Sequence, residues 1–184
     1  MTKHKGFWWE EPWTGEEVMG YKTGVIREYK DKFGLDILVE TGTYAGDTVE
    51  FGRHRFRDVY SVEIDPRNYE AAKERFKGVP NVHLYLADTE DWLPEIVKLL
   101  SEEGTVYWLD AHKSGEGTPY GKTPFPVLEE LGILLKANLK NAVVLMDDID
   151  STFFQKIKAI APEAQELGGW IAEMRIARGI QDGY

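Results

Sequence analysis

The chain has 184 residues, of which 42% are apolar, and this size and composition suit one domain with a packed core. Its 22 basic and 32 acidic residues give a formal net charge of −10, which disfavours nucleic acids and anionic membranes as partners. The absence of cysteine excludes disulfides, thiolate metal sites and thiol nucleophiles. Because no apolar stretch reaches transmembrane length and the N-terminus lacks a signal-peptide pattern, we expect a soluble, cytoplasmic protein.

The first 15 residues, MTKHKGFWWEEPWTG, read as an irregular arm ahead of the domain proper, which we place at 16–184. The arm carries three tryptophans, Trp8, Trp9 and Trp13. We expect them to cover an apolar patch or to form a contact in a homo-oligomer, with a lid over an acceptor as the alternative. From 16 to 33 apolar residues recur at roughly helical spacing, and Gly34 then ends the helix.

A regular alternation of strand and helix patterns follows. The strands are expected at 36–40, 59–65, 81–88, 105–110 and 141–148. The helices are expected at 46–56, 66–76, 89–103, 124–138 and 151–161. Such alternation indicates βαβ units, and the continuous apolar runs fit a parallel sheet covered on both faces. We therefore predict an α/β, Rossmann-like three-layer sandwich with a mostly parallel sheet of six or seven strands, the tail supplying a strand at 170–177 and room for a short second.

All five predicted strands end on a carboxylate. These residues are Glu40, Glu63, Asp88, Asp110 and the pair Asp147-Asp148. Ligands of open α/β sheets bind beyond the carboxyl ends of the strands, so we expect these side chains to meet at one rim.

The turn after the first strand, ETGTYAG, carries two glycines four residues apart, Gly42 and Gly46. Glycines there let the backbone approach a ligand, and the following helix offers free N–H groups, although a tight turn alone would explain them equally well. Glu63 ends the next strand, where an acidic side chain can hold ribose hydroxyls. The two features together favour a ligand that contains a nucleoside.

The stretches LVETGTYAGDTVEF, VYSVEIDPRNYEAAKERF, VHLYLADTEDWLPEI, VYWLDAHK and VVLMDDI resemble the ordered motifs of class I S-adenosylmethionine-dependent methyltransferases, over roughly residues 36–150. The last two are similar to the cation-dependent branch typified by catechol O-methyltransferase, with sugar O-methyltransferases as further relatives. In that branch Asp ends the fourth strand, Lys follows three residues later, and Asp-Asn ends the fifth. This chain has Asp110, Lys113 and Asp147-Asp148, so Asp148 replaces the Asn and adds a negative charge.

The resemblance implies a set of residues that contact S-adenosylmethionine. The methionine part would lie over Glu40, Gly42, Thr43 and Gly46, Glu63 would hold the ribose, Asp88 and Thr89 would lie beside the adenine, and Asp110 would also contact the cofactor. Trp92 either packs on the adenine or belongs to the core, and its place on an apolar helix face favours the core.

The resemblance also implies a metal site on Asp110, Asp147 and Asp148. All-oxygen ligation indicates Mg²⁺, Mn²⁺ or Ca²⁺, and such a cation would lower the pKa of an acceptor hydroxyl. Lys113 is then a candidate base, His112 is its rival, and Asp110 lies beside both as a catalytic residue. Alternatively, the run DDID at 147–150 simply caps the next helix.

The sequence thus predicts a methyltransferase that uses S-adenosylmethionine to modify a hydroxyl of a small molecule, with metal assistance. A sugar, a phenol and a secondary metabolite are equally compatible acceptors, and the Gly-rich loop 111–123, which contains Tyr120, is expected to act as a substrate-side flap. The short tail leaves open a non-catalytic, methyltransferase-like binding or assembly domain. A nicotinamide-dependent oxidoreductase is a further alternative, although G-x-G-x-x-G and Tyr-x-x-x-Lys are missing.

Overall fold

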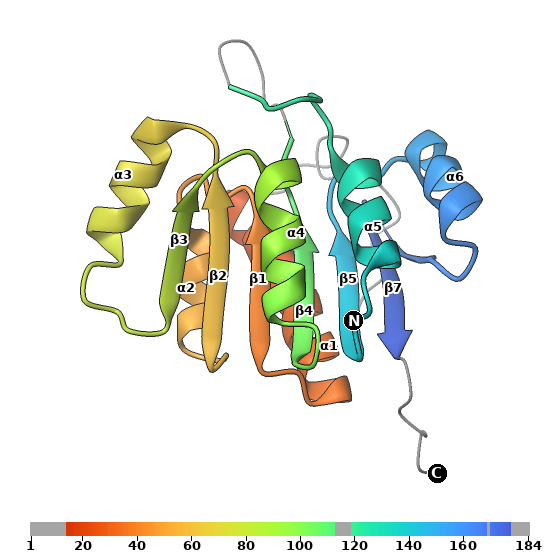
Figure 1. Cartoon of the computed structure of the whole chain (residues 1–184), viewed down its shortest axis with the longest axis horizontal. Helices are drawn as coiled ribbons and strands as arrows, with labels where there is room; N and C mark the ends of the chain where they lie inside the picture. Colours follow the sequence, from red (N-terminus) through yellow and green to blue (C-terminus); the bar gives the residue numbers. More distant parts are fainter. Residues whose placement is uncertain (1–13, 113–118, 169, 178–184) are drawn as a thin grey trace.

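The computed structural model describes residues 14–112, 119–168 and 170–177. They form a seven-stranded sheet between two layers of helices (Figure 1). The strands are β1 (Ile37–Thr41), β2 (Asp58–Glu63), β3 (Val82–Leu86), β4 (Gly104–Leu109), β5 (Asn141–Met146), β6 (Gln165–Gly168) and β7 (Ile171–Ala177). The helices are α1 (Gly15–Phe33), α2 (Asp47–Arg53), α3 (Pro66–Arg75), α4 (Thr89–Leu99), α5 (Val127–Lys136) and α6 (Ser151–Ile160). The predicted three-layer α/β architecture is confirmed.

The strand order is β3-β2-β1-β4-β5-β7-β6. Strands β1 to β5 pair in parallel, whereas β7 runs antiparallel to β5 and β6, and its arrow points the opposite way in Figure 1. The order of the strands reverses beside β1, which pairs with β2 on one side and with β4 on the other. This is the topological switch point, where open α/β sheets bind their ligands.

Successive side chains of each strand enter opposite core layers, as the pleat of a strand requires. In β4, Tyr107 and Leu109 pack with helices α4, α5 and α6, while Val106 and Trp108 pack with α1, α2 and α3. All four are essentially inaccessible to solvent. Because both faces are covered, the strands are continuously apolar, which is the pattern that the sequence shows.

The element boundaries differ from the predicted ones by at most four residues, and β3, β4 and β5 end before the carboxylates that follow them. The prediction overlooked one strand, β6, because Gln165 and Glu166 are exposed on an edge strand that pairs only with β7. The strand predicted at 170–177 is confirmed as β7, and β6 precedes it in the chain. The short second strand predicted after β7 would fall on residues outside the described ranges.

Helix α1 begins with a capping box, in which the Thr14 backbone N–H donates to Glu17 Oε2 at 2.9 Å and the Glu17 N–H donates to Thr14 Oγ1 at 3.2 Å. The three arm tryptophans precede the described residues, so their contacts stay a prediction. No helix in the described part of the chain is long and apolar enough to cross a membrane.

Candidate functional site

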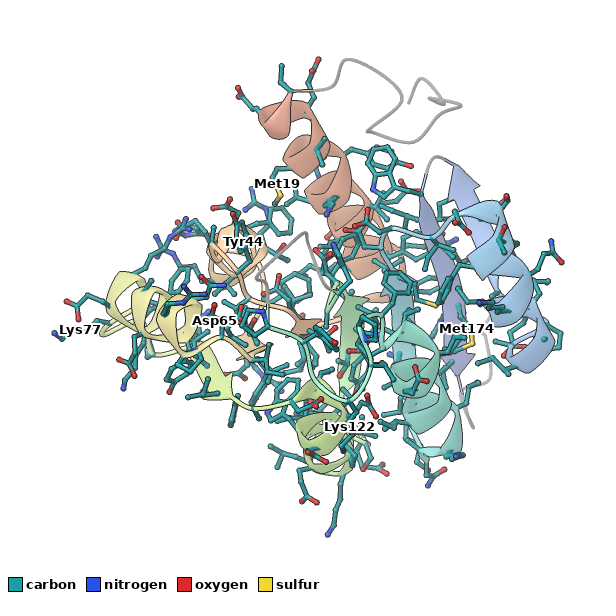
Figure 2. All side chains as sticks on the ribbon, turned by 90° about the horizontal axis from the view of Figure 1, so that it is seen from above. Met19, Tyr44, Asp65, Lys77, Lys122 and Met174 are labelled. Carbon is teal, nitrogen blue, oxygen red and sulfur yellow. The ribbon has the colours of Figure 1, made fainter. Side chains whose placement is uncertain are left out.

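A cavity of about 360 Å³ lies at the carboxyl edge of the sheet, beside the switch point. Residues that follow all five parallel strands line it, as the carboxylate pattern of the sequence predicts, and α1 contributes Val18 and Lys22. Figure 2 looks down on this edge, with Tyr44 between Met19 of α1 and Asp65 ahead of α3. The cavity therefore brings together parts of the chain that are far apart in sequence.

The turn between β1 and α2 approaches β4 closely at Gly42. Gly42 has a φ of +87°, and a Cβ added there would lie 2.9 Å from the carbonyl oxygen of Asp110. Tyr44, two residues on, also has a left-handed backbone, with a φ of +46°, and its N–H donates to Glu63 Oε2 at 2.8 Å. Left-handed non-glycine residues are concentrated at functional sites, and Tyr44 lines the cavity while its side chain is 75% exposed.

Glu63 presents its carboxylate to the cavity from the end of β2. Its Oε2 accepts the Tyr44 N–H, and its Oε1 accepts the Asp65 N–H at 2.8 Å. A carboxylate offers about four acceptor positions, so about two remain for a ligand. The two backbone bonds fix the orientation of Glu63, which is 7% exposed.

Three residues predicted to contact the cofactor, Glu40, Thr43 and Gly46, lie outside the cavity lining. Glu40 and Thr43 are buried and share Ser61, whose Oγ is 2.6 Å from Glu40 Oε2 and 2.6 Å from Thr43 Oγ1. Gly46 caps α2, and a Cβ there would lie 2.7 Å from the Phe76 ring. Thr43 and Gly46 lie in the predicted turn and Glu40 lies near the end of β1, but the spacing in the sequence cannot distinguish a residue that supports the turn from one that faces a ligand.

The carboxyl of Glu40 gives a pH-dependent prediction. Burial raises its pKa from 4.5 to about 8, although the hydrogen bond that Ser61 donates to the carboxylate acts to lower the pKa. The folded state therefore retains a proton that the unfolded chain loses, so the free energy of unfolding should fall by about 1.4 kcal/mol per pH unit between about 4.5 and 8 from this group. Glu40→Gln should remove this slope, which urea unfolding from pH 5 to 8.5 measures. Parallel pH profiles for the two proteins would contradict the assignment.

Asp88 and Thr89 line the cavity on the side of α4. Asp88 caps α4 by accepting the Glu90 N–H at 3.0 Å, and its other oxygen accepts the Lys122 N–H at 3.0 Å. Figure 2 shows Lys122 above α4, where its ammonium pairs with Asp91. The end of the loop that follows β4 is thus held over this part of the cavity, and Tyr120 in it lines the cavity. Residues 113–118 of the predicted flap lie outside the described ranges, so its role stays a prediction.

The opposite end of the cavity is acidic. One ligand atom each from Asp110, His112 and Asp148 can be chosen so that all lie within 4.8 Å of one another. The His112 ring lies between the two carboxylates, with Nδ1 3.5 Å from Asp110 Oδ1 and Nε2 3.1 Å from Asp148 Oδ2. Asp148 has a left-handed φ of +55°, and burial raises the pKa of Asp110, although Lys22 opposes the shift.

The third predicted metal ligand, Asp147, is outside this group of three, although it lies close enough to Asp110 for the two charges to interact. Its side chain is fully buried and forms an ion pair with Lys22 of α1, and the same ammonium is 3.5 Å from Asp110 Oδ2. Burial alone would lower the pKa of Lys22, but the charges of Asp110 and Asp147 outweigh burial and raise it. The structure thus brings Asp110 and Asp148 together with His112 and directs Asp147 to a lysine.

Sequence reasoning missed Lys22, although the sequence contains a signal. Lys22 lies on the same helical stripe as Val18, Val25, Ile26 and Tyr29, the last three of which are buried. A single lysine within an apolar stripe is costly unless a carboxylate meets it, so its position indicates a buried ion pair. Lys113, the candidate base, lies outside the described residues, and its role stays a prediction.

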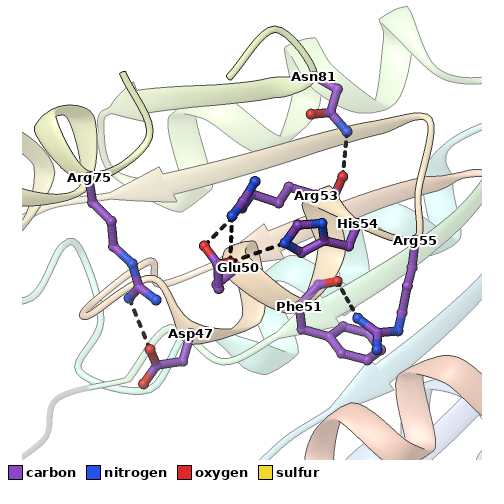
Figure 3. A network of polar contacts seen from close by, with 8 residues as sticks. All are labelled: Asp47, Glu50, Phe51, Arg53, His54, Arg55, Arg75 and Asn81. Carbon is purple, nitrogen blue, oxygen red and sulfur yellow. Dashed lines mark hydrogen bonds and ion pairs between the residues drawn. The ribbon is translucent and has the colours of Figure 1, made fainter. Parts of the chain in front are cut away.

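A second group of charged residues, along α2 and at the end of α3, is outside the cavity lining. Figure 3 shows the contacts within this group. Glu50 accepts hydrogen bonds from Arg53 at 2.8 and 2.9 Å and lies 3.3 Å from the His54 ring, while Arg75 is 2.9 Å from Asp47. These charges compensate one another on the surface of the molecule. We assign no binding role to them.

Trp92 packs in the core, where its ring centroid lies 5.3 Å from that of Tyr85. Of the two alternatives for Trp92, packing on the adenine or a place in the core, the structure shows the place in the core.

No family model and no curated protein matches the sequence. Among solved structures, an O-methyltransferase from Bacillus cereus in complex with S-adenosylhomocysteine (SAH) matches with a TM-score of 0.62 and 14% identity, over 85% of this chain and 81% of that chain. A SAH-bound methyltransferase from Podospora anserina matches with a TM-score of 0.61 and 16% identity, over 89% and 79%. A 23S rRNA methyltransferase matches with a TM-score of 0.54 and 18% identity, over 84% and 68%.

These identities are low, and proteins with this fold act on different acceptors, so the likeness establishes the fold and leaves the acceptor open. The chain has the Rossmann-like fold of the class I methyltransferases.

Proposed function

We propose that this protein is an S-adenosylmethionine-dependent methyltransferase that modifies a hydroxyl of a small molecule with the help of a divalent cation. The observation that carries the proposal is a single cavity with two chemically different ends. Glu63 and Gly42 line one part of it, and Asp110, His112 and Asp148 line another. Its volume of about 360 Å³ is in the range of small-molecule and cofactor sites, about 300–1,000 Å³.

The residues present fit the adenosine part of the cofactor. Glu63 has acceptor positions left for two hydroxyls, and its two backbone bonds fix its orientation before any ligand binds. Gly42 leaves open the space that a side chain would fill against Asp110. Both features lower the cost of ordering a bound nucleoside, because the groups that would hold it are already in place.

When bound, S-adenosylmethionine supplies an activated methyl group, so the chain's residues need to orient the acceptor and remove its proton. Asp110 and Asp148 are the carboxylates available to hold a cation near the acceptor. His112 and Lys113 are the candidate bases, and a residue that binds the cation cannot also serve as the base.

A small acceptor is favoured over a nucleic acid by charge. The chain carries a net charge of −10, and the cavity end proposed for the acceptor is itself acidic. A polyanion would be repelled by the net charge of the chain and again by the acidic end of the cavity. Two exposed aromatic residues, Tyr44 and Tyr120, line the cavity and offer apolar contacts to a ring.

The non-catalytic alternative was motivated by the short tail. Strands β6 and β7 complete a seven-stranded sheet within the described residues, so the length of the tail no longer supports that alternative.

Isothermal titration calorimetry with SAH tests the cofactor. We expect saturable binding, weakened about 10- to 100-fold in Glu63→Gln, because hydrogen bonds to a charged group contribute about 1.5–3 kcal/mol. Glu70→Gln is the matched control, since Glu70 is exposed on α3, outside the cavity lining, and pairs with Lys73 at 3.5 Å. Binding of NAD⁺ without binding of SAH would replace this proposal with an oxidoreductase.

Transfer of a labelled methyl group from S-adenosylmethionine to phenols and sugars, with and without EDTA, tests the reaction. Labelled product that disappears in EDTA and returns with a divalent ion supports the proposal. Binding of SAH without any product across the panel would favour a binding domain.

A further inference from the structure

Three carboxylates gather at the acidic end of the cavity, and two of them, Asp110 and Asp148, belong to its lining. Asp110, Asp147 and Asp148 together carry three negative charges when ionised, and the Lys22 ammonium returns one positive charge. The His112 ring lies against Asp110 and Asp148, and all three carboxylates belong to side chains that are at most 18% exposed. Carboxylates gathered in such a place repel one another, and a divalent cation held among them would relieve that repulsion.

Lys22 meets these carboxylates unequally. Its ammonium is in direct contact with Asp147 Oδ2 and lies 3.5 Å from Asp110 Oδ2. The Asp147 side chain has no exposed surface, and the charge of Asp110 also acts on it. Asp147 is therefore committed to Lys22 as its cationic partner.

His112 is the third member of the group that contains Asp110 and Asp148. Both of its ring nitrogens face carboxylates, at 3.5 Å from Asp110 and at 3.1 Å from Asp148. Ligand atoms that share an ion at about 2.0–2.4 Å lie no more than about 4–4.8 Å apart, which the spacing within this group satisfies.

We propose that Lys22 acts as a fixed counter-cation that removes Asp147 from the ligand set, so that the site binds its cation through Asp110, His112 and Asp148. This inference rests on the proposed function only where it assigns the bound cation a role in methyl transfer. An imidazole among the ligands favours first-row transition ions over Mg²⁺ and Ca²⁺, which prefer oxygen alone. The site is therefore selective for Mn²⁺ over Mg²⁺, and His112 is a cation ligand that leaves Lys113 as the candidate base.

Calorimetric titration of the purified protein with MnCl₂ and with MgCl₂, without cofactor or acceptor, tests this assignment. We expect saturable binding of Mn²⁺ that is on the order of tenfold tighter than that of Mg²⁺. His112→Ala should weaken Mn²⁺ binding at least tenfold and remove the preference over Mg²⁺. His112→Asp should restore Mg²⁺ binding, since it replaces the imidazole with a carboxylate.

The double variant Lys22→Met/Asp147→Asn provides the complementary test. It removes the ion pair but leaves the net charge and the three proposed ligands, so its Mn²⁺ affinity should stay within about threefold of the original. Lys30→Met is the control for a lysine lost from α1, since the partner of Lys30, Asp36, is 66% exposed. Circular dichroism confirms that each variant is folded before titration.

Loss of Mn²⁺ binding in the double variant, with normal binding in His112→Ala, would show that Asp147 is a ligand and overturn the assignment. Absence of saturable binding of either ion by the unsubstituted protein would also overturn it. SAH binding, measured on the same samples, reports separately on the proposed function, so either proposal can fail without the other.

Discussion

Gly42→Ala is expected to abolish measurable SAH binding and to lower the free energy of unfolding by about 2–3 kcal/mol. Alanine at a φ of +87° is strained by about 1–2 kcal/mol. Its Cβ would also lie 2.9 Å from the carbonyl oxygen of Asp110 and 3.2 Å from the Cα of Ala111, so backbone on one side must shift. Because both sides line the cavity, the shift displaces the surface on which a cofactor would rest.

Gly20→Ala is the matched control for this prediction. Gly20 lies within α1, where an added Cβ meets nothing within 4 Å, so alanine should leave SAH binding unchanged and raise stability by about 0.5–1 kcal/mol. Urea unfolding measures the stability of both variants, and calorimetry measures SAH binding. Normal SAH affinity in Gly42→Ala would show that this turn does not contact the cofactor.

The sheet could be predicted because four of its five parallel strands, β1, β2, β4 and β5, are largely buried and all five alternate with helices. Burial on both faces produces apolar runs that local sequence reveals directly. Strand β6 lacks this signal, since its formation depends on pairing with β7 and its exposed residues Gln165 and Glu166 are polar. An edge strand that depends on a partner is visible only once the partner is placed.

The candidate site was predictable to the extent that it follows from topology. Parallel strands deliver their carboxyl ends to one edge, and Gly42, Glu63, Asp88 and Asp110 accordingly line one cavity. The directions of individual side chains were not predictable. Asp147 and Asp148 are neighbours in sequence, yet the left-handed backbone of Asp148 and the ammonium of Lys22 give them different partners.

Lys22→Met should be among the most destabilising single substitutions in the chain, lowering the free energy of unfolding by about 3–5 kcal/mol. Removing one partner of a buried ion pair leaves the other charge uncompensated, and that desolvation cost exceeds the value of the pair itself. Asp147 has no exposed side-chain surface through which water could replace the ammonium. Its neighbour Asp110, 3.5 Å from the same ammonium, adds repulsion once Lys22 is gone.

The double variant Lys22→Met/Asp147→Asn should recover most of this loss, because replacing both members of a buried pair with neutral side chains is often close to neutral. Lys30→Met should cost no more than about 1 kcal/mol, since the partner Asp36 is 66% exposed and its 3.8 Å ion pair is screened by solvent. Urea unfolding of the three variants makes the comparison. If the double variant is no more stable than Lys22→Met, then Lys22 supports the fold through packing and not through the charge of Asp147.

A double variant that regains stability and still binds Mn²⁺ would separate the two roles of the acidic end. Asp147 and Lys22 would then hold α1 against the sheet, and Asp110, His112 and Asp148 would bind the cation.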